Sequence, residues 1–487
     1  MDFFSKYQKL KPSTNIQKSY LAILDNLDLN GHVSFNYSLI NSTNWKSEPK
    51  IDNLTDINLQ TLYGLSYALK DNFATKDLPM TIGCQFLRNF YPFYNSTVFE
   101  KLYTQGAQMI CKSNLDELSM AGTGIFSLNG PVKNPWNKLH ISGGSSSGSA
   151  ALVACGAVSF AIGTDTGDSV RKPAAYCGVV GFKPSWGMIS RYGLADYAPS
   201  LDTVGVFTNS VKDCVTVTNC LIGYDPKDFT TYHLKNKDIT IKLSTNKDKK
   251  YKFFIFKETD NDDFKDNIKL HFDDLVNNLK AKGHTIEYVS FKSLLLSSLT
   301  VCYEIISYAE ASSCNSNLLG TTFGENVDKK YQSWFDQIFA NRTNYLGSMV
   351  KRRFAIGSFV LSSATKGIYF KKAKIIRKII VHKMEELFKT YDCLIAPTIS
   401  KPAPLISKYK IDDPFYDHEN SSLENQLLIS NFCGSPSINI PFKLVNGLPT
   451  GIILTADRNE DQKLLSIAQE LESIIKFENL LLKNGKA

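Results

Sequence analysis

Short apolar segments alternate with helical patterns along most of this chain, starting at Leu62. The apolar segments predict buried strands, and the longer amphipathic segments between them predict helices. Strands are expected at residues 67–69, 107–111, 158–162, 252–256, 391–398, 437–441 and 450–454, and helices at 97–105, 149–156, 266–282 and 462–474. An alternation of this kind is typical of a layered α/β fold.

The 487 residues are enough for one large domain or for two to three smaller ones, and no composition shift separates two units. We expect an N-terminal segment of helix and loop over residues 1–60, with an exposed connection at 36–56. One large domain follows over 61–480, and 481–487 form a tail. Within the domain, residues 225–252 resemble a polar surface linker, and residues from about 303 to 389 predict a helical excursion from the sheet.

The composition indicates a packed globular protein, because 43% of the residues are hydrophobic. The net charge of +8 permits contact with RNA but is typical of a solvated lysine-rich surface. Ten cysteines without a CxxC pair favour reduced thiols in an intracellular compartment, and seven histidines without ligand spacing predict no metal site. No secretory h-region and no run of 18 apolar residues occur, so no membrane contact is expected. These features favour the cytoplasm, with the mitochondrial matrix as the alternative.

Three short motifs carry the chemistry of the chain. Lys70 closes the apolar run 63–69, Ser145 lies in a glycine- and serine-rich stretch at 142–149, and Ser169 follows 24 residues later within 163–171. A serine hydroxyl is a poor nucleophile until a base takes its proton, and no histidine accompanies these serines. The set therefore predicts a base, a relay and a nucleophile. Lys70 would act as the base in its neutral form, which burial favours and a nearby cation such as Arg171 would favour further.

Each motif also has a simpler interpretation. Lys70 alone could be a surface lysine, and the stretch 142–149 alone could be a flexible loop. The same stretch matches the GxSxG pattern with Ser146 as nucleophile, although that site needs a preceding strand and a later Asp and His. A phosphate cradle is not favoured, because the chain has no GxxxxGK[ST].

Taken together and in this order, the motifs resemble the amidase signature family of Ser-cisSer-Lys amide hydrolases. The likeness extends through residues 114–118, 134–136, 178–184, 190–194 and 200–202 and covers roughly 60 to 475. It implies a single large α/β domain whose mixed sheet is covered by helices on both faces. It also implies that Ser169 forms the acyl ester, that Ser145 follows a cis peptide bond and relays the proton, and that Lys70 is the base.

The resemblance places the oxyanion hole at the backbone N–H groups of Thr166, Gly167, Asp168 and Ser169. Asp168 stands where most family members carry glycine. A carboxylate beside a developing oxyanion is unfavourable unless it points away or pairs with a cation, and Arg171 or Lys172 could supply that cation. Activity is expected to be retained, and a catalytically decayed scaffold protein is the alternative.

Within the family, the chain is most similar to the glutamine-hydrolysing subunits of tRNA-dependent amidotransferases. The resemblance assigns the glutamine pocket to Met120, Tyr303, Arg353 and Glu424, the last where the family usually has Asp. Arginine suits the substrate carboxylate, and the acidic residue suits its ammonium group. A stand-alone amidase acting on small amides is the alternative.

The same resemblance implies the partners. Ammonia from glutamine would convert Glu-tRNA(Gln), and in some members Asp-tRNA, at a B subunit with kinase and transamidase activity. ATP and Mg²⁺ would bind that B subunit rather than this chain. A small C-type subunit would complete the assembly.

Overall fold

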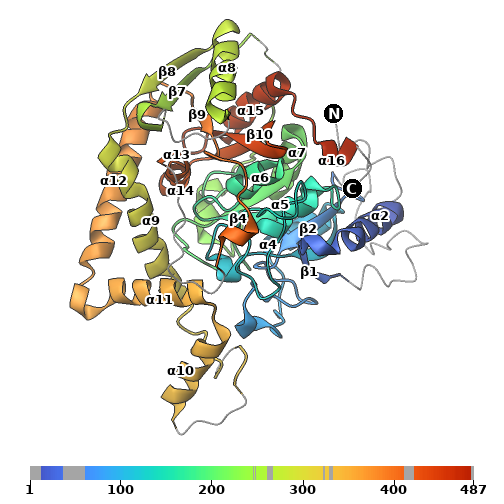
Figure 1. Ribbon diagram of the computed structural model, residues 1–487, viewed down its shortest axis with the longest axis vertical. Helices are drawn as coiled ribbons and strands as arrows, with labels where there is room; N and C mark the ends of the chain where they lie inside the picture. Colours follow the sequence, from blue (N-terminus) through green and yellow to red (C-terminus); the bar gives the residue numbers. More distant parts are fainter. Residues whose placement is uncertain are drawn as a thin grey trace.

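A computed structural model describes residues 12–36, 61–244, 246, 248–259, 267–321, 324–327, 333–410 and 422–483. Its centre is an 11-stranded sheet (Figure 1). The strand order is β1 (His32–Phe35), β3 (Gln108–Ser113), β2 (Ser66–Lys70), β4 (Phe160–Asp165), β6 (Thr203–Thr208), β5 (Val180–Lys183), β10 (Ser437–Val445), β11 (Leu448–Thr455), β9 (Cys393–Pro397), β7 (Lys252–Phe256) and β8 (Thr285–Val289).

The sheet is mixed, as the resemblance implies. Strand β2 is parallel to both β3 and β4, and β7 is parallel to both β8 and β9. The strands between these two parallel groups pair antiparallel. Because β2, β3 and β4 run in one direction, their carboxyl ends lie at the same end of the sheet. The candidate site lies at this end.

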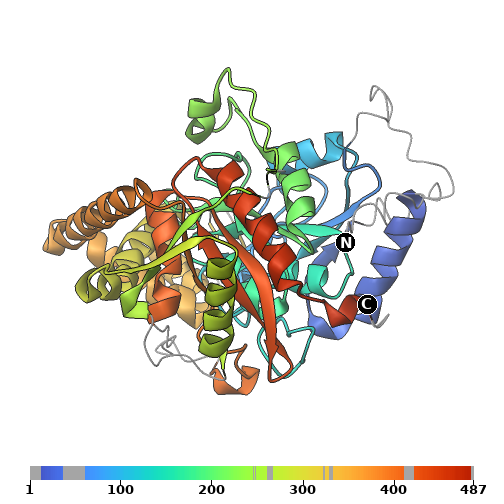
Figure 2. The same cartoon turned by 90° about the horizontal axis from the view of Figure 1, so that it is seen from above.

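Helices cover both faces of the sheet. Neighbouring side chains of a strand point to opposite faces, so the contacts of a single strand show which helices lie on each face. On β2, Tyr67 and Leu69 belong to the core cluster that includes residues of α4 (Thr97–Thr104), α7 (Val211–Leu221), α8 (Ile268–Ala281) and α15 (Asp461–Ile475). Ala68 belongs to the cluster with α2 (Pro12–Asp25), α5 (Ser147–Ala154) and α6 (Arg171–Cys177). Figure 2 shows α15 lying across β10 and β11.

The helical excursion consists of α9 (Ser293–Cys314), α10 (Trp334–Tyr345), α11 (Ser348–Leu361) and α12 (Ile368–Phe388). It begins about ten residues earlier than the sequence predicts, and α10 projects from the body of the molecule (Figure 1). By length and composition alone, α9 could cross a membrane. In this fold α9 packs against α11 and α12, and Leu299, Cys302 and Ile306 on it are buried.

The N-terminal segment contributes more than helix and loop, because β1 joins the sheet at its edge and pairs antiparallel with β3. Residues 37–60 and 484–487, part of the expected connection and tail, lie outside the described residues. The short helices α13 (Ser422–Asn425) and α14 (Leu427–Cys433) precede β10, and α16 (Leu480–Lys483) follows α15.

Candidate active site

Lys70 lies at the carboxyl end of β2 and is fully buried. Its Nζ donates hydrogen bonds to Ser145 Oγ and Thr164 Oγ1, each at 2.8 Å. Thr164 is near the end of β4, the parallel neighbour of β2, so the sheet itself brings these two side chains together. The structure therefore places the predicted base against the predicted relay, and Lys70 is not a surface lysine.

Burial lowers the pKa of Lys70 to about 7, although Asp116, Asp165 and Asp202 act in the opposite direction. Arg171 does not contribute in the way the sequence suggested. Its guanidinium is neutralised by Asp165, with Nη2 to Oδ1 at 2.9 Å and Nε to Oδ2 at 3.0 Å. Desolvation, not a neighbouring cation, is what favours the neutral amine.

The stretch 142–149 is buried and not a flexible loop. The serines at 142, 145, 146, 147 and 149 are at most 1% exposed, and the Gly144–Ser145 peptide bond is cis. Asp116 accepts hydrogen bonds from the backbone N–H groups of Gly124 and Phe126, and its backbone N–H donates to Ser145 O at 3.3 Å. A Cβ on Gly144 would collide with the Asp116 carboxylate, so the loop at 116–126 closes tightly over the relay serine.

Ser146, the nucleophile of the GxSxG alternative, has a structural role instead. Its hydroxyl donates to Thr164 O at 3.1 Å and accepts from Thr164 N at 3.2 Å. The side chain is fully buried, so it joins the start of α5 to the end of β4 and is not presented to a substrate.

Ser169 sits on the turn between β4 and α6 and is 6% exposed. Its carbonyl oxygen accepts from Ser146 N at 3.3 Å, which ties the turn to the relay segment. Among the described residues, the Ser169 hydroxyl makes no hydrogen bond. The structure therefore contains the first link of the predicted relay, Lys70 to Ser145, but not a hydrogen bond from Ser145 to Ser169.

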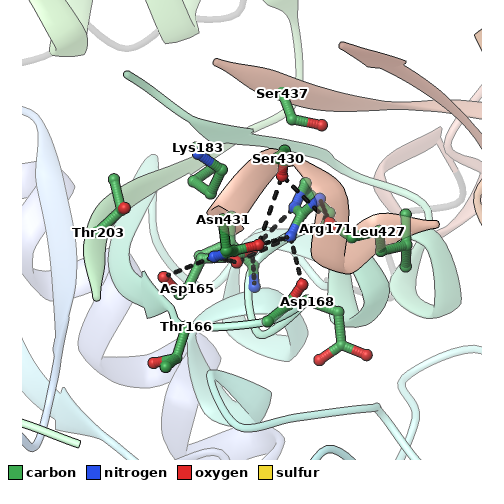
Figure 3. Close-up of polar contacts among 12 residues, drawn as sticks. Asp165, Thr166, Asp168, Arg171, Lys183, Thr203, Leu427, Ser430, Asn431 and Ser437 are labelled. Carbon is green, nitrogen blue, oxygen red and sulfur yellow. Dashed lines mark hydrogen bonds and ion pairs between the residues drawn. The ribbon is translucent and has the colours of Figure 1, made fainter. Parts of the chain in front are cut away.

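A buried cluster under this turn fixes its shape (Figure 3). Arg171 bonds Asp165 through two nitrogens and also donates to Asn431 Oδ1 at 2.8 Å and to Gly167 O at 2.6 Å. Asn431 in turn donates to Asp165 Oδ1 at 2.9 Å. Burial alone would raise the pKa of Asp165, but Arg171, Lys183 and Asn431 together lower it below its ordinary value. The turn is thus fixed from below by an ion pair with satisfied hydrogen bonds.

Gly167 is needed because Tyr303 covers it. A Cβ at this position would lie 2.9 Å from Tyr303 Cζ and 3.0 Å from Leu428 Cδ2. Such contacts are tighter than side chains tolerate without moving. The structure therefore brings Tyr303, a residue assigned to the pocket, directly against the backbone assigned to the oxyanion hole.

Asp168 points away from the Arg171 cluster, and its side chain is 21% exposed. Its cation is Lys172, whose Nζ is 3.7 Å from Asp168 Oδ2 and 2.8 Å from Glu424 Oε2. Burial raises the pKa of Asp168, and Lys172 lowers it in part. Of the two cations the sequence offered for Asp168, only Lys172 pairs with it, since Arg171 pairs with Asp165.

Glu424, which the resemblance assigns to the glutamine pocket, is buried and already has partners within the chain. Its Oε1 accepts from Ser400 Oγ at 3.0 Å and from Ser400 N at 3.4 Å, and its Oε2 faces Lys172. Burial would raise its pKa, but Lys172 and the hydrogen bonds from Ser400 together lower it. Its role in substrate binding stays a prediction.

Arg353 is buried on α11 among tyrosines. Its Nη1 donates to Tyr197 OH at 2.9 Å, and its guanidinium lies 4.9 Å from the ring centre of Tyr308. Its Nε has no hydrogen-bond acceptor, and no carboxylate among the described residues pairs with it. Met120 is 1% exposed and belongs to the apolar cluster against which Tyr303 packs.

Two further side chains, Thr164 and Asn72, lie in the hydrogen-bond network of the candidate site. Thr164 Oγ1 accepts from Lys70 and also from Asn72 Nδ2 at 3.0 Å, and Asn72 reaches Ser119 Oγ at 3.2 Å. Thr164 lies within the stretch 163–171 and Asn72 follows Lys70 by two residues, so their closeness in sequence to the predicted site residues was the available signal. No local pattern points to Asn431, because it reaches the turn from a segment 260 residues away.

All ten cysteines are free thiols. Within the part of the chain that the structure describes, no group of three or more His, Cys, Asp or Glu side chains is placed to hold a metal ion.

The family model described as Amidase matches residues 19–465. The A subunit of glutamyl-tRNA(Gln) amidotransferase from Mycoplasma genitalium is 39% identical over 417 residues, covering 85% of this chain and 86% of that protein. The protein of the same name from Mycoplasma pneumoniae is 37% identical over 485 residues, covering 97% and 99%.

Two solved structures have a similar fold. The A subunit of glutamyl-tRNA(Gln) amidotransferase from Thermotoga maritima superposes with a TM-score of 0.75 at 29% identity, covering 96% of this chain and 93% of that chain. A peptide amidase from Stenotrophomonas maltophilia gives 0.80 at 23% identity, covering 96% and 94%, and supports the fold alone. Since the family match spans most of the sequence and the sheet places Lys70 against Ser145, the chain belongs to the amidase signature family.

Proposed function

We propose that this chain is the glutamine-hydrolysing subunit of a tRNA-dependent amidotransferase. The observation that carries the chemistry is the 2.8 Å contact between the buried Lys70 Nζ and Ser145 Oγ, beside the turn that holds Ser169. A lysine whose pKa lies near 7 is a competent base at neutral pH. The relatives that bear the amidotransferase name support the choice of glutamine as the amide.

The reaction proceeds through an ester on Ser169. Neutral Lys70 takes a proton from Ser145, which takes the proton of Ser169, and the Ser169 oxygen attacks the side-chain carbonyl carbon of glutamine. The backbone N–H groups of residues 166–169 stabilise the negative charge that forms on the carbonyl oxygen. The proton then returns through Ser145 to the amide nitrogen, the C–N bond breaks and ammonia leaves. Water attacks the ester by the same route and releases glutamate.

Arg353 accounts for the preference for glutamine over neutral amides. The Arg353 guanidinium is buried, its Nε has no acceptor, and no carboxylate among the described residues pairs with it. Such a cation is suited to bind a carboxylate of the substrate. Tyr303 lies against Gly167 of the nucleophile turn, and Met120 belongs to the apolar cluster against which Tyr303 packs.

The ammonia would be used by other subunits of the same assembly. In this proposal a B-type subunit, with ATP and Mg²⁺, activates the glutamate of Glu-tRNA(Gln) and accepts the ammonia, and a small C-type subunit joins the two. This chain needs no cofactor of its own for its half of the reaction, and the cytoplasm is its proposed location.

The test is ammonia release from glutamine by the chain alone and with its co-expressed partner subunits, Glu-tRNA(Gln), ATP and Mg²⁺. Ser169→Ala should abolish both ammonia release and the formation of glutamyl hydroxamate with hydroxylamine. Ser146→Ala is the matched control: it should lower stability, because Thr164 loses a buried partner, but still form the hydroxamate. Full activity of Ser169→Ala would contradict the mechanism. Equal turnover of neutral amides by wild type and Arg353→Gln, without turnover of glutamine, would contradict the choice of substrate.

A further inference from the structure

Glu117 is a buried carboxylate that the proposed mechanism does not use. It lies on the short 3₁₀ turn Glu117–Ser119 and is 8% exposed. Its Oε2 and Oε1 accept a hydrogen bond from the backbone N–H of Gly347, at 2.9 Å and 3.2 Å. Gly347 immediately precedes α11 and has no side chain that could cap this helix. The Glu117 carboxylate therefore closes the N-terminal end of α11, where free N–H groups and the helix dipole favour a negative charge.

The close approach of these two segments depends on glycine at position 347. A Cβ on Gly347 would collide with Glu117 Oε2, although its backbone, at φ −69° and ψ 162°, is one that other residues also adopt. Burial raises the pKa of Glu117 to about 6, while the Cys84 thiol, the Gly347 N–H and Lys351 act in the opposite direction. At pH 8 the carboxyl is therefore ionised.

The turn that carries Glu117 is fixed to the relay side of the candidate site. Asp116, directly before it, donates from its backbone N–H to Ser145 O at 3.3 Å. Ser119 Oγ accepts from Asn72 at 3.2 Å, and Asn72 also donates to the threonine that accepts from the base. The turn thus contacts the surroundings of both the base and the relay serine.

The helix α11 carries Arg353 between two points of attachment. Arg353 is six residues beyond Gly347, which corresponds to about 9 Å along a helix axis. Four residues further on, Gly357 fits closely against α9, where a Cβ would collide with Tyr308 O. At its start, α11 follows α10, which projects from the body of the molecule (Figure 1), and the Glu117 carboxylate joins this end to the relay side.

Apolar packing accompanies the hydrogen bond between Glu117 and the start of α11. Val350 and Phe354 of α11 lie in one buried cluster with Leu118 and Met120. Apolar contacts are non-directional, so they hold two surfaces together without defining one position along them. A hydrogen bond to a particular N–H group does define such a position. The carboxylate therefore determines where α11 begins relative to the turn.

We propose that Glu117 is a positioning residue that sets the place of Arg353 relative to the base and the nucleophile. By joining the turn to the start of α11, it keeps a fixed separation between the cation for the substrate carboxylate and the reacting groups. A displacement of about 1 Å from the productive geometry can cost about a hundredfold in rate. The inference rests on the proposed function and deepens it, because it names a residue outside the pocket on which the selection of glutamine depends.

The experiment is a double-mutant cycle on kcat/KM for ammonia release from glutamine, measured in the full assembly at pH 8. Glu117→Gln removes the charge at the helix end and should lower kcat/KM about ten- to a hundredfold, mostly through KM. In the Arg353→Gln background, the same change should lower it by no more than about threefold, because the cation that Glu117 positions is already absent. Gly347→Ala, which displaces the carboxylate from the other side, should show the same pattern and provides a second reading if Glu117→Gln does not fold.

Glu472→Gln is the matched control. Its Oε1 accepts from Val211 N at 2.9 Å at the start of α7, a helix to which no residue of the candidate site is assigned. This variant removes an equivalent contact and should leave kcat/KM for glutamine within about twofold of the wild-type value. The same loss in Glu472→Gln as in Glu117→Gln would overturn the inference, since it would show a general effect of weakened helix ends.

Two other results would overturn the inference while leaving glutamine hydrolysis by the wild type, and so the proposed function, intact. One is an unchanged kcat/KM in Glu117→Gln and Gly347→Ala. The other is an equal loss from Glu117→Gln with and without Arg353, which would show that Glu117 acts on the relay and not on this cation. Absence of ammonia release from glutamine by the wild-type assembly would overturn both the inference and the proposed function.

Discussion

The pH dependence of glutamine hydrolysis tests directly whether Lys70 acts as a neutral base with a lowered pKa. With its pKa at about 7, the neutral fraction of this amine is about one-eleventh at pH 6, one half at pH 7 and ten-elevenths at pH 8. The kcat should therefore rise about tenfold between pH 6 and pH 8 and stay level above that. With the ordinary pKa of 10.5, kcat would rise about a hundredfold over the same interval and continue to rise beyond pH 10.

The physical cause is the burial of the amine at the end of β2. Lys70 is 0% exposed, and the difference between 10.5 and about 7 corresponds to about 5 kcal/mol against the charged form. Among the groups that oppose this shift, Asp116 contributes most. Replacing Asp116 by Asn removes a negative charge that favours protonated Lys70, so the midpoint of the profile should move to lower pH.

The assay is single-turnover ammonia release at constant ionic strength, with Ser169→Ala as the background at each pH. Single-turnover conditions isolate the chemical step from product release. A profile that keeps rising tenfold per pH unit above pH 9 would refute the lowered pKa. A midpoint that moves upward in Asp116→Asn would refute the electrostatic account of its origin.

Three further changes probe the rest of the site. Lys70 stays protonated up to about pH 10.5 in the unfolded chain but only below about pH 7 in the folded chain. As the pH rises between these limits, the unfolding free energy of wild type should therefore increase by up to about 1.4 kcal/mol per pH unit relative to Lys70→Met. Urea titrations of both proteins at pH 7 and 9 would measure this, and the same difference in unfolding free energy at both pH values would count against it. Gly167→Ala places a Cβ 2.9 Å from Tyr303 Cζ and should lower kcat at least about a hundredfold, with partial recovery in a double variant with Tyr303→Leu. Arg171→Met leaves Asp165 buried without its cation and should cost about 3–5 kcal/mol in urea denaturation, part of which Asp165→Asn should restore.

The secondary structure was predictable where the apolar pattern is strong. The expected strands at 67–69, 252–256 and 450–454 fall within β2, β7 and β11, and the expected helix at 266–282 contains α8. Strand β1 was not predicted, because an edge strand with half-exposed residues lacks a clear apolar pattern. Strand β5 is only four residues long and contains a glycine, so its partners β6 and β10, and not its own residues, determine it.

The sequence predicted residues for the candidate site but not the pairings between their side chains. The order of the motifs was enough to single out Lys70, Ser145 and Ser169 and to draw attention to Asp168. The order of the motifs could not show which cation pairs with Asp168, because Arg171 and Lys172 both follow it within four residues. Packing resolved the choice: Asp165 and Asn431 take Arg171, and Glu424 holds Lys172.

The sequence by itself therefore determined the family of this protein and, through its motifs, the prediction that two serines, a lysine and a turn of backbone N–H groups act on an amide. Only the tertiary structure decided their charge states and partners. Lys70 has a low pKa because the parallel strands on either side of β2 enclose it, and Arg171 is neutral in effect because Asp165 lies 2.9 Å away. The physical reason is that desolvation and Coulomb interactions depend on distances between groups from distant parts of the chain, and a linear sequence does not contain those distances.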